Sequence, residues 1–172
     1  MTQIPTLTAA RLVLRPFTAD DVDPLHEILQ QEGIMAYFPG GKAPPRDAVE
    51  RLVQAQLREW EERGYGWWAV AQKSEPGHPI VGWCGLGYLP DTDETEVAYL
   101  LSKDLWGQGY ATEGALASIE WGFSMLGLSE IVGIVHPENI ASQRVLEKLG
   151  MDRTARTEYF GMDCYRYALQ RP

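Results

Sequence analysis

Cysteine is scarce in this sequence, and long apolar segments are missing. Two of the 172 residues are cysteine, and the spacing of Cys84 and Cys164 matches neither a metal-binding motif nor a disulfide framework, so we expect two buried free thiols. No apolar run approaches the ~20 residues of a membrane-spanning helix, and residues 1–6 lack the basic and apolar pattern of a signal peptide. We therefore expect a cytoplasmic protein with no metal site and no membrane partner.

Positive charge is also in short supply. The chain has 15 Lys and Arg residues against 24 Asp and Glu residues, which gives a formal net charge of −9. A nucleic-acid-binding surface needs basic side chains to neutralise phosphates, so this imbalance argues against nucleic acid as a ligand. It favours a cationic partner such as an amine or a basic peptide. The length and the absence of repeats or a linker predict a single domain over residues 1–172.

Strand and helix patterns alternate along the chain. Alternating or short apolar runs predict seven strands, at residues 11–15, 67–71, 80–88, 95–101, 131–135, 151–157 and 162–169. Helical spacing predicts four helices, one from Thr18 or Asp20 to Leu29 and others over residues 47–63, 110–126 and 140–149. This order predicts an α/β (α+β) domain with a mixed central sheet of about seven strands and about four flanking helices.

The most informative segment is a glycine-containing turn before the third predicted helix, with the sequence LSKDLWGQGYAT over residues 101–112. Gly107 and Gly109 let the backbone turn sharply, and the backbone N–H groups at the start of the helix are free to bind an anion. The P-loop pattern is absent, and Gly107, Gly109 and Gly114 do not have the spacing of a dinucleotide fingerprint. On its own, the turn fits a tight connection or a phosphate site.

Residues farther along the chain favour the phosphate site. An apolar strand at residues 131–135 leads into a helix that Asn139 caps and Gly150 ends. Together with Ser142, the segments WGQGYA and LGM resemble the cofactor signature of the GNAT acetyltransferase superfamily. The segment WGQGYATE and the opening segment TAARLVLRP resemble one branch of this superfamily, the ribosomal-protein-alanine N-acetyltransferases. This resemblance covers nearly the whole chain, and it implies a mostly antiparallel sheet and the use of acetyl-coenzyme A as cosubstrate without a metal.

The resemblance and the turn together indicate a coenzyme A site with three parts. Backbone N–H groups at the helix start suit the pyrophosphate, the edge of the preceding strand suits the amide-like pantetheine arm, and the resemblance places Asn139 and Ser142 beside the thioester. Asn139 also has the ordinary role of a helix cap. The residues expected to bind the cofactor are Tyr99, Leu100, Leu101, Gly107, Gln108, Gly109, Tyr110, Ala111, Thr112, Asn139 and Ser142.

Acetyl transfer to an amine also needs a base, a polarised carbonyl and an acid. Glu96 is the expected base, because it lies in the strand beside the cofactor and alternates with Ala98 and Leu100. A backbone N–H near Leu101 would polarise the thioester carbonyl. At two catalytic positions the chain departs from the resembled family: Leu146 stands where many members have a tyrosine acid, and Ile134 stands where some have a glutamate.

Ser142 is therefore the expected acid, with the hydroxyls of Tyr99, Tyr159 and Tyr165 as further candidates. His136 is more simply explained as part of a turn at the end of a strand. Acceptor recognition is expected from the loop at residues 37–41, the first two helices and the turn at residues 159–161.

The sequence predicts an N-acetyltransferase that moves an acetyl group from acetyl-coenzyme A to a primary amine by direct attack. The amine acceptor is either a protein N-terminal α-amine or a small molecule such as a polyamine or an aminoglycoside. A catalytically weak acyl-coenzyme A-binding module for sensing or recruitment is the alternative, since two common catalytic choices are absent. Both a monomer and a homodimer fit the sequence.

Overall fold

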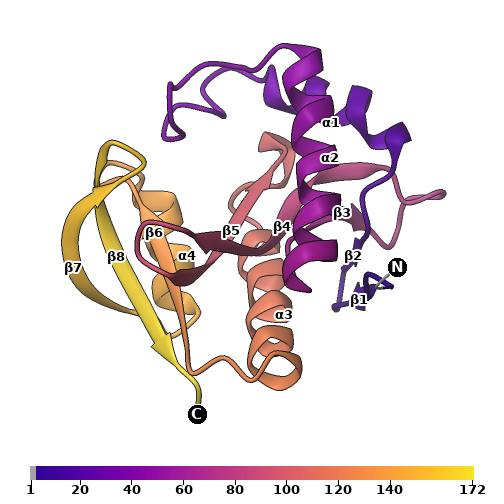
Figure 1. Cartoon of the computed structure of the whole chain (residues 1–172). Coiled ribbons are helices and arrows are strands. Elements are labelled where there is room, and N and C mark those ends of the chain that lie inside the picture. Colours follow the sequence, from indigo (N-terminus) through magenta and orange to yellow (C-terminus); the bar gives the residue numbers. More distant parts are fainter. Residues whose placement is uncertain (1–2) are drawn as a thin grey trace.

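The computed structural model describes residues 3–172, and within them one sheet of eight strands runs through the molecule (Figure 1). Its strand order is β1-β2-β3-β4-β5-β6-β8-β7, and every neighbouring pair is antiparallel except β5 and β6. The strands are β1 (Leu7–Thr8), β2 (Leu12–Arg15), β3 (Trp67–Gln72), β4 (Ile80–Leu89), β5 (Glu94–Leu101), β6 (Glu130–Val135), β7 (Asp152–Tyr159) and β8 (Met162–Gln170).

Within residues 3–172, four α-helices cover the two faces of this sheet, and two short 3-10 turns lie at Ala19–Asp21 and Lys103–Leu105. The helices are α1 (Val22–Leu29), α2 (Arg46–Arg63), α3 (Tyr110–Met125) and α4 (Ile140–Lys148). Apolar residues of α1 and α2 pack with Trp83 and Leu100 on one face, whereas residues of α3 and α4 pack with Val97 and Leu101 on the other. Alternate side chains of β5 therefore face different helices.

The predicted α/β class and its mixed sheet are confirmed, and the strands and helices lie close to their predicted positions. The sheet has one strand more than predicted, because Leu7 and Thr8 pair with Leu14 and Val13. A two-residue strand is too short to show an alternating pattern. Both cysteines are free and buried, as expected.

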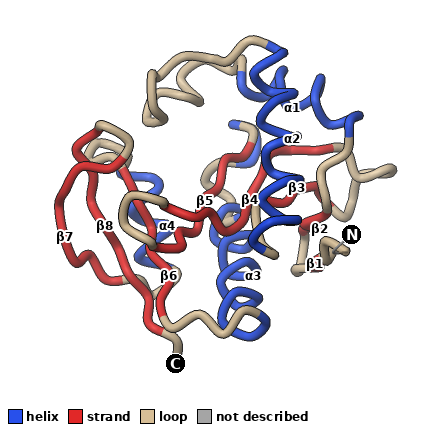
Figure 2. Tube along the Cα trace, in the orientation of Figure 1, coloured by secondary structure: helices blue, strands red, loops and turns tan. Residues whose placement is uncertain are grey.

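The sheet opens between β5 and β6. These parallel strands share a single paired position, Glu96 with Val132, whereas β4 pairs with β5 over its whole length. Beyond Glu96 the two strands separate, and Figure 2 shows β6, β8 and β7 turned away from the rest of the sheet. Among the described residues, no strand pairs with this side of residues 97–101, so backbone groups of β5 face the opening.

None of the helices in residues 3–172 combines the length and the apolar character that a bilayer crossing requires.

Candidate active site

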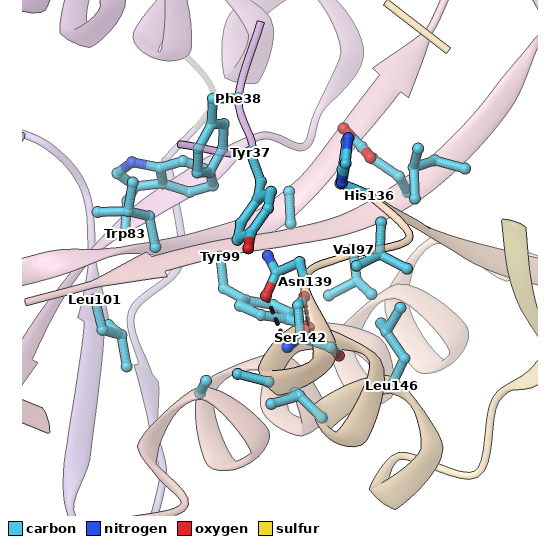
Figure 3. Close-up of a pocket in the computed structure, with 18 of the residues that line it drawn as sticks. Tyr37, Phe38, Trp83, Val97, Tyr99, Leu101, His136, Asn139, Ser142 and Leu146 are labelled. Carbon is cyan, nitrogen blue, oxygen red and sulfur yellow. Dashed lines mark hydrogen bonds between the residues drawn. The ribbon is translucent and has the colours of Figure 1, made fainter. Parts of the chain in front are cut away.

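A large cavity occupies the opening between β5 and β6 (Figure 3). Its volume is about 1130 Å³. Residues from α2, β3, β4, β5 and β6, from the loop between α1 and α2, and from the starts of α3 and α4 line it. All but one of the residues predicted to bind the cofactor line this cavity, and so do Glu96 and Ser142. The structure thus brings together residues that lie more than forty positions apart in the sequence, such as Tyr99 and Ser142.

The turn before α3 has the backbone geometry that its glycines permit. Gly107 and Gly109 have φ angles of 73° and 81°, in the left-handed region that favours glycine. Gly109 is the N-cap of α3, and no side chain caps this helix end. The first N–H groups of α3 are therefore free to bind an anion, and Tyr110, Ala111 and Thr112 line the cavity there.

Gln108 is the one predicted cofactor-binding residue that does not line the cavity. Its Nε2 donates to the carbonyl of Asp104 at 2.7 Å, and its own carbonyl accepts a hydrogen bond from Arg11 at 3.0 Å. Arg11 is in turn held by Glu113, whose carboxylate accepts bonds from the Arg11 backbone N–H at 2.6 Å and side-chain Nε at 2.7 Å. This network fixes the turn to β2, so Gln108 contributes to its shape rather than to the cavity wall.

On the α4 side of β5, Tyr99 and Ser142 form a hydroxyl pair. The phenol oxygen of Tyr99 lies 2.9 Å from Ser142 Oγ and 3.3 Å from the Ser142 carbonyl. Asn139 begins α4, and its side-chain oxygen accepts a hydrogen bond from the Ser142 backbone N–H at 3.2 Å. Burial raises the pKa of Tyr99 well above its ordinary value, so the phenol stays protonated and can donate.

Glu96 lies on the opposite face of β5 from Tyr99, as the alternation of the strand predicts. It stands at the last paired position before β5 and β6 separate, and Gly87 of β4 is its antiparallel partner. Burial raises the pKa of the Glu96 carboxyl from 4.5 to about 8. A carboxyl with this pKa exchanges a proton readily near neutral pH, which suits a general base.

Two hydrophobic side chains occupy the positions where the sequence departs from the family pattern. Leu146 is buried, and a methyl group on Gly133 would lie 2.6 Å from its Cδ2 atom, so its side chain fills the space over β6. Ile134 lines the cavity as an apolar wall. Neither side chain can transfer a proton. Glu96 and the Tyr99–Ser142 pair line the cavity on the two faces of β5 and carry groups that can.

Two of the other predicted candidates lie outside the cavity. The Tyr159 phenol donates to Glu94 at 2.8 Å, and the ring of Tyr165 lies under Arg153, with 4.5 Å between the guanidinium and the ring centroid. The His136 ring accepts a hydrogen bond from the Glu138 backbone N–H at 3.2 Å and stacks on Tyr37. His136 thus has the structural role expected of a turn residue, although it also lines the cavity.

Sequence analysis missed an aromatic wall on the α2 side of the cavity. Trp67 and Trp83 stack with 3.8 Å between ring centroids and 5° between planes, and Phe38 meets Trp83 edge-on at 6.1 Å. Tyr37 points from the same loop into the cavity and stacks on His136 at 5.2 Å (Figure 3). The loop at residues 37–41, expected to contact the acceptor, thus reaches across the opening through Tyr37.

No group of three or more His, Cys, Asp or Glu side chains that could hold a metal ion occurs within residues 3–172.

Comparison with known proteins identifies the family. Residues 11–152 match the model described as "Acetyltransferase (GNAT) domain". A curated relative, the FsC-acetyl coenzyme A-N(2)-transacetylase of Aspergillus fumigatus, is 29% identical over 161 residues, which cover 86% of this chain. The chain spans only 65% of the length of that relative.

Solved structures share the same fold. A GNAT-family acetyltransferase from Bacillus anthracis has a TM-score of 0.82 and 25% identity, covering 96% of this chain and 98% of that one. The RimL ribosomal L7/L12 alpha-N-protein acetyltransferase, solved in complex with coenzyme A, has a TM-score of 0.78 and 18% identity, with 97% of each chain covered. The chain therefore belongs to the GNAT family of acetyltransferases.

Proposed function

We propose that this protein transfers an acetyl group from acetyl-coenzyme A to the nitrogen of a primary amine. The observation that carries the proposal is the distribution of groups around β5. Glu96 faces the aromatic side of the cavity, and the Tyr99–Ser142 hydroxyl pair faces α4. A reacting thioester held in the opening between β5 and β6 would thus have a base on one side and an acid on the other.

The cavity has features that fit coenzyme A. The uncapped start of α3 suits the pyrophosphate, through the N–H groups of Tyr110, Ala111 and Thr112. The free side of β5 suits the pantetheine amides, which can hydrogen-bond to backbone groups as an added strand does. The relative named for acetyl coenzyme A and the coenzyme A complex of a neighbouring structure support this donor.

The reaction needs no covalent enzyme intermediate. Glu96 removes a proton from the ammonium form of the acceptor, and the free nitrogen lone pair attacks the thioester carbonyl carbon. The carbon–sulfur bond then breaks, and Ser142 gives its proton to the departing thiolate. As the amide forms, its nitrogen gives up its second proton to solvent. Tyr99 lies within hydrogen-bond distance of Ser142 and can pass it a replacement proton, which solvent restores to the phenol. The products are an N-acetyl amide and free coenzyme A.

Acetyl-coenzyme A-dependent release of free thiol tests this proposal. The panel would contain polyamines, aminoglycosides, amino acids and short peptides with different N-terminal residues. We expect release with one class of amine and a reduced rate for Ser142→Ala with that amine. Thermal stabilisation by acetyl-coenzyme A without thiol release for any amine would contradict acetyl transfer and favour a binding module. Full activity of the Ser142→Ala variant would refute the role of Ser142 as acid.

A further inference from the structure

Trp67 has a buried hydrogen-bond donor without a partner. Among the buried side-chain nitrogen and oxygen atoms of residues 3–172, its indole Nε1 is the one that has no hydrogen-bond partner. An unpaired buried donor is costly, because it has lost its bond to water without gaining another. Such a group in a cavity wall therefore calls for a functional explanation.

The donor faces the same space as the Glu96 carboxylate. Trp67 and Gly85 are partners across β3 and β4, and Gly87, two residues farther along β4, is the partner of Glu96. A methyl group placed on Gly87 would lie 3.4 Å from Trp67 Nε1 and 3.4 Å from Glu96 Oε1. Gly87 brings no side chain between the two polar atoms, which are at most twice that distance apart.

The direction of the donor is fixed by the surroundings of Trp67. Its ring stacks on the buried ring of Trp83. Its backbone N–H donates to Gln56 Oε1 at 2.9 Å, and its carbonyl accepts a bond from Trp60 Nε1 at 3.1 Å. Because ring and backbone are both held, Nε1 cannot easily turn toward another acceptor, and it presents a preorganised N–H beside the proposed base.

We propose that the indole N–H of Trp67 binds a carbonyl oxygen next to the acceptor amine, and that the enzyme thereby selects α-amino carbonyl compounds over plain alkylamines. This inference rests on the function proposed above. In such a compound the nitrogen and the oxygen are joined through N–Cα–C=O and lie less than about 4 Å apart. One acceptor molecule can then place its amine on Glu96 and its oxygen on Trp67. A polyamine offers only further cationic donors and leaves the indole unpaired.

Alaninamide and isopropylamine test this directly, because they share a branched carbon next to the amine and only alaninamide has the carbonyl. Trp67→Phe removes the N–H and keeps an aromatic ring against Trp83. We expect this variant to lower kcat/KM for alaninamide about tenfold more than kcat/KM for isopropylamine, which is the effect of one unpaired buried group. The informative quantity is the ratio of kcat/KM for alaninamide to kcat/KM for isopropylamine. A change in this ratio between wild type and variant cannot come from the basicity of the amines, because each amine has the same basicity in both assays.

Trp83→Phe is the matched control, since it alters the same stack and keeps the Trp67 donor. If Trp83→Phe lowered the alaninamide-to-isopropylamine ratio of kcat/KM as much as Trp67→Phe does, the inference would be overturned and the effect assigned to packing. A loss shared by both amines in Trp67→Phe, with a changed pH profile, would overturn it as well and make Trp67 a positioning residue for Glu96.

The wild-type enzyme provides a second measurement if Trp67→Phe does not fold. Compared at equal concentrations of unprotonated amine, it should prefer alaninamide, and a preference for isopropylamine would overturn the inference. A wild-type enzyme that acetylates amines without this preference contradicts only the role of Trp67. A wild-type enzyme that binds acetyl-coenzyme A and acetylates no amine contradicts the proposed function itself.

Discussion

Replacing Glu96 with glutamine should make the protein more stable, and increasingly so as the pH rises. Burial raises the pKa of Glu96 from 4.5 to about 8 in the folded state, so the folded protein holds this proton more tightly than the unfolded chain. The protonated carboxyl contributes its full stabilising free energy below about pH 4.5, and this contribution is lost as the pH rises through about 8. Glutamine has a similar shape and does not titrate.

The difference between 4.5 and about 8 corresponds to about 5 kcal/mol of unfolding free energy. Glu96 is only half-buried and opens onto the cavity, where solvent screens its charge, so we expect about 2 to 4 kcal/mol. Urea denaturation of the wild type and Glu96→Gln from about pH 4 to pH 9 measures this difference in unfolding free energy. The two proteins should be nearly equal at the acid end, and the variant should be more stable at the alkaline end.

Glu94 on the same strand is the matched control for this experiment. Burial acts to raise the pKa of its carboxyl, but hydrogen bonds from Thr92, from Tyr159 at 2.8 Å and from Arg166 at 2.7 Å outweigh burial and lower the pKa below its ordinary value. Glu94→Gln should therefore destabilise the protein at neutral pH, and its effect should fade as the pH falls through that lowered pKa. A stability difference for Glu96→Gln that is constant with pH, or that shrinks as the pH rises, would refute the reasoning.

Three further predictions follow from other contacts. Tyr99→Phe removes the phenol that reaches Ser142, so kcat should fall by about tenfold or more with little change in KM for acetyl-coenzyme A; unchanged steady-state kinetics would exclude the relay. Gly133→Ala forces a methyl group against Leu146 and should cost about 1–3 kcal/mol in urea denaturation. Glu113→Ala removes the carboxylate that holds Arg11 and the turn before α3, so calorimetry should show weaker coenzyme A binding. An unchanged affinity would show that this hydrogen-bond network does not shape the phosphate site.

Local patterns in the sequence were sufficient to predict most of the fold and the faces on which several residues of the candidate site lie. Alternation along residues 95–101 correctly separates Glu96 from Tyr99, and the glycines at 107 and 109 correctly mark the turn before α3. The departure at Leu146 is also visible in the sequence, and the structure explains it through the close packing of Leu146 on Gly133.

Features that depend on strand register could not be predicted in this way. The stack of Trp67 on Trp83 exists because Trp67 pairs with Gly85 and Ala69 with Trp83, which no local pattern specifies. The contact between Tyr99 and Ser142 joins residues that lie 43 positions apart and depends on how α4 packs against β5. The direction of the Gln108 side chain, which donates to the Asp104 carbonyl, could not be predicted either, because a motif does not determine a side-chain direction.

The central claim is that Glu96 removes the proton of the acceptor amine, and the pH dependence of kcat/KM for one acceptor tests it most directly. The same amine is used with the wild type and with Glu96→Gln, so its own titration is common to both profiles. We predict that the wild-type value rises with pH through about 8, and that the variant is slower by about a hundredfold or more and lacks this rise. A Glu96→Gln enzyme with the rate and the profile of the wild type would contradict the claim.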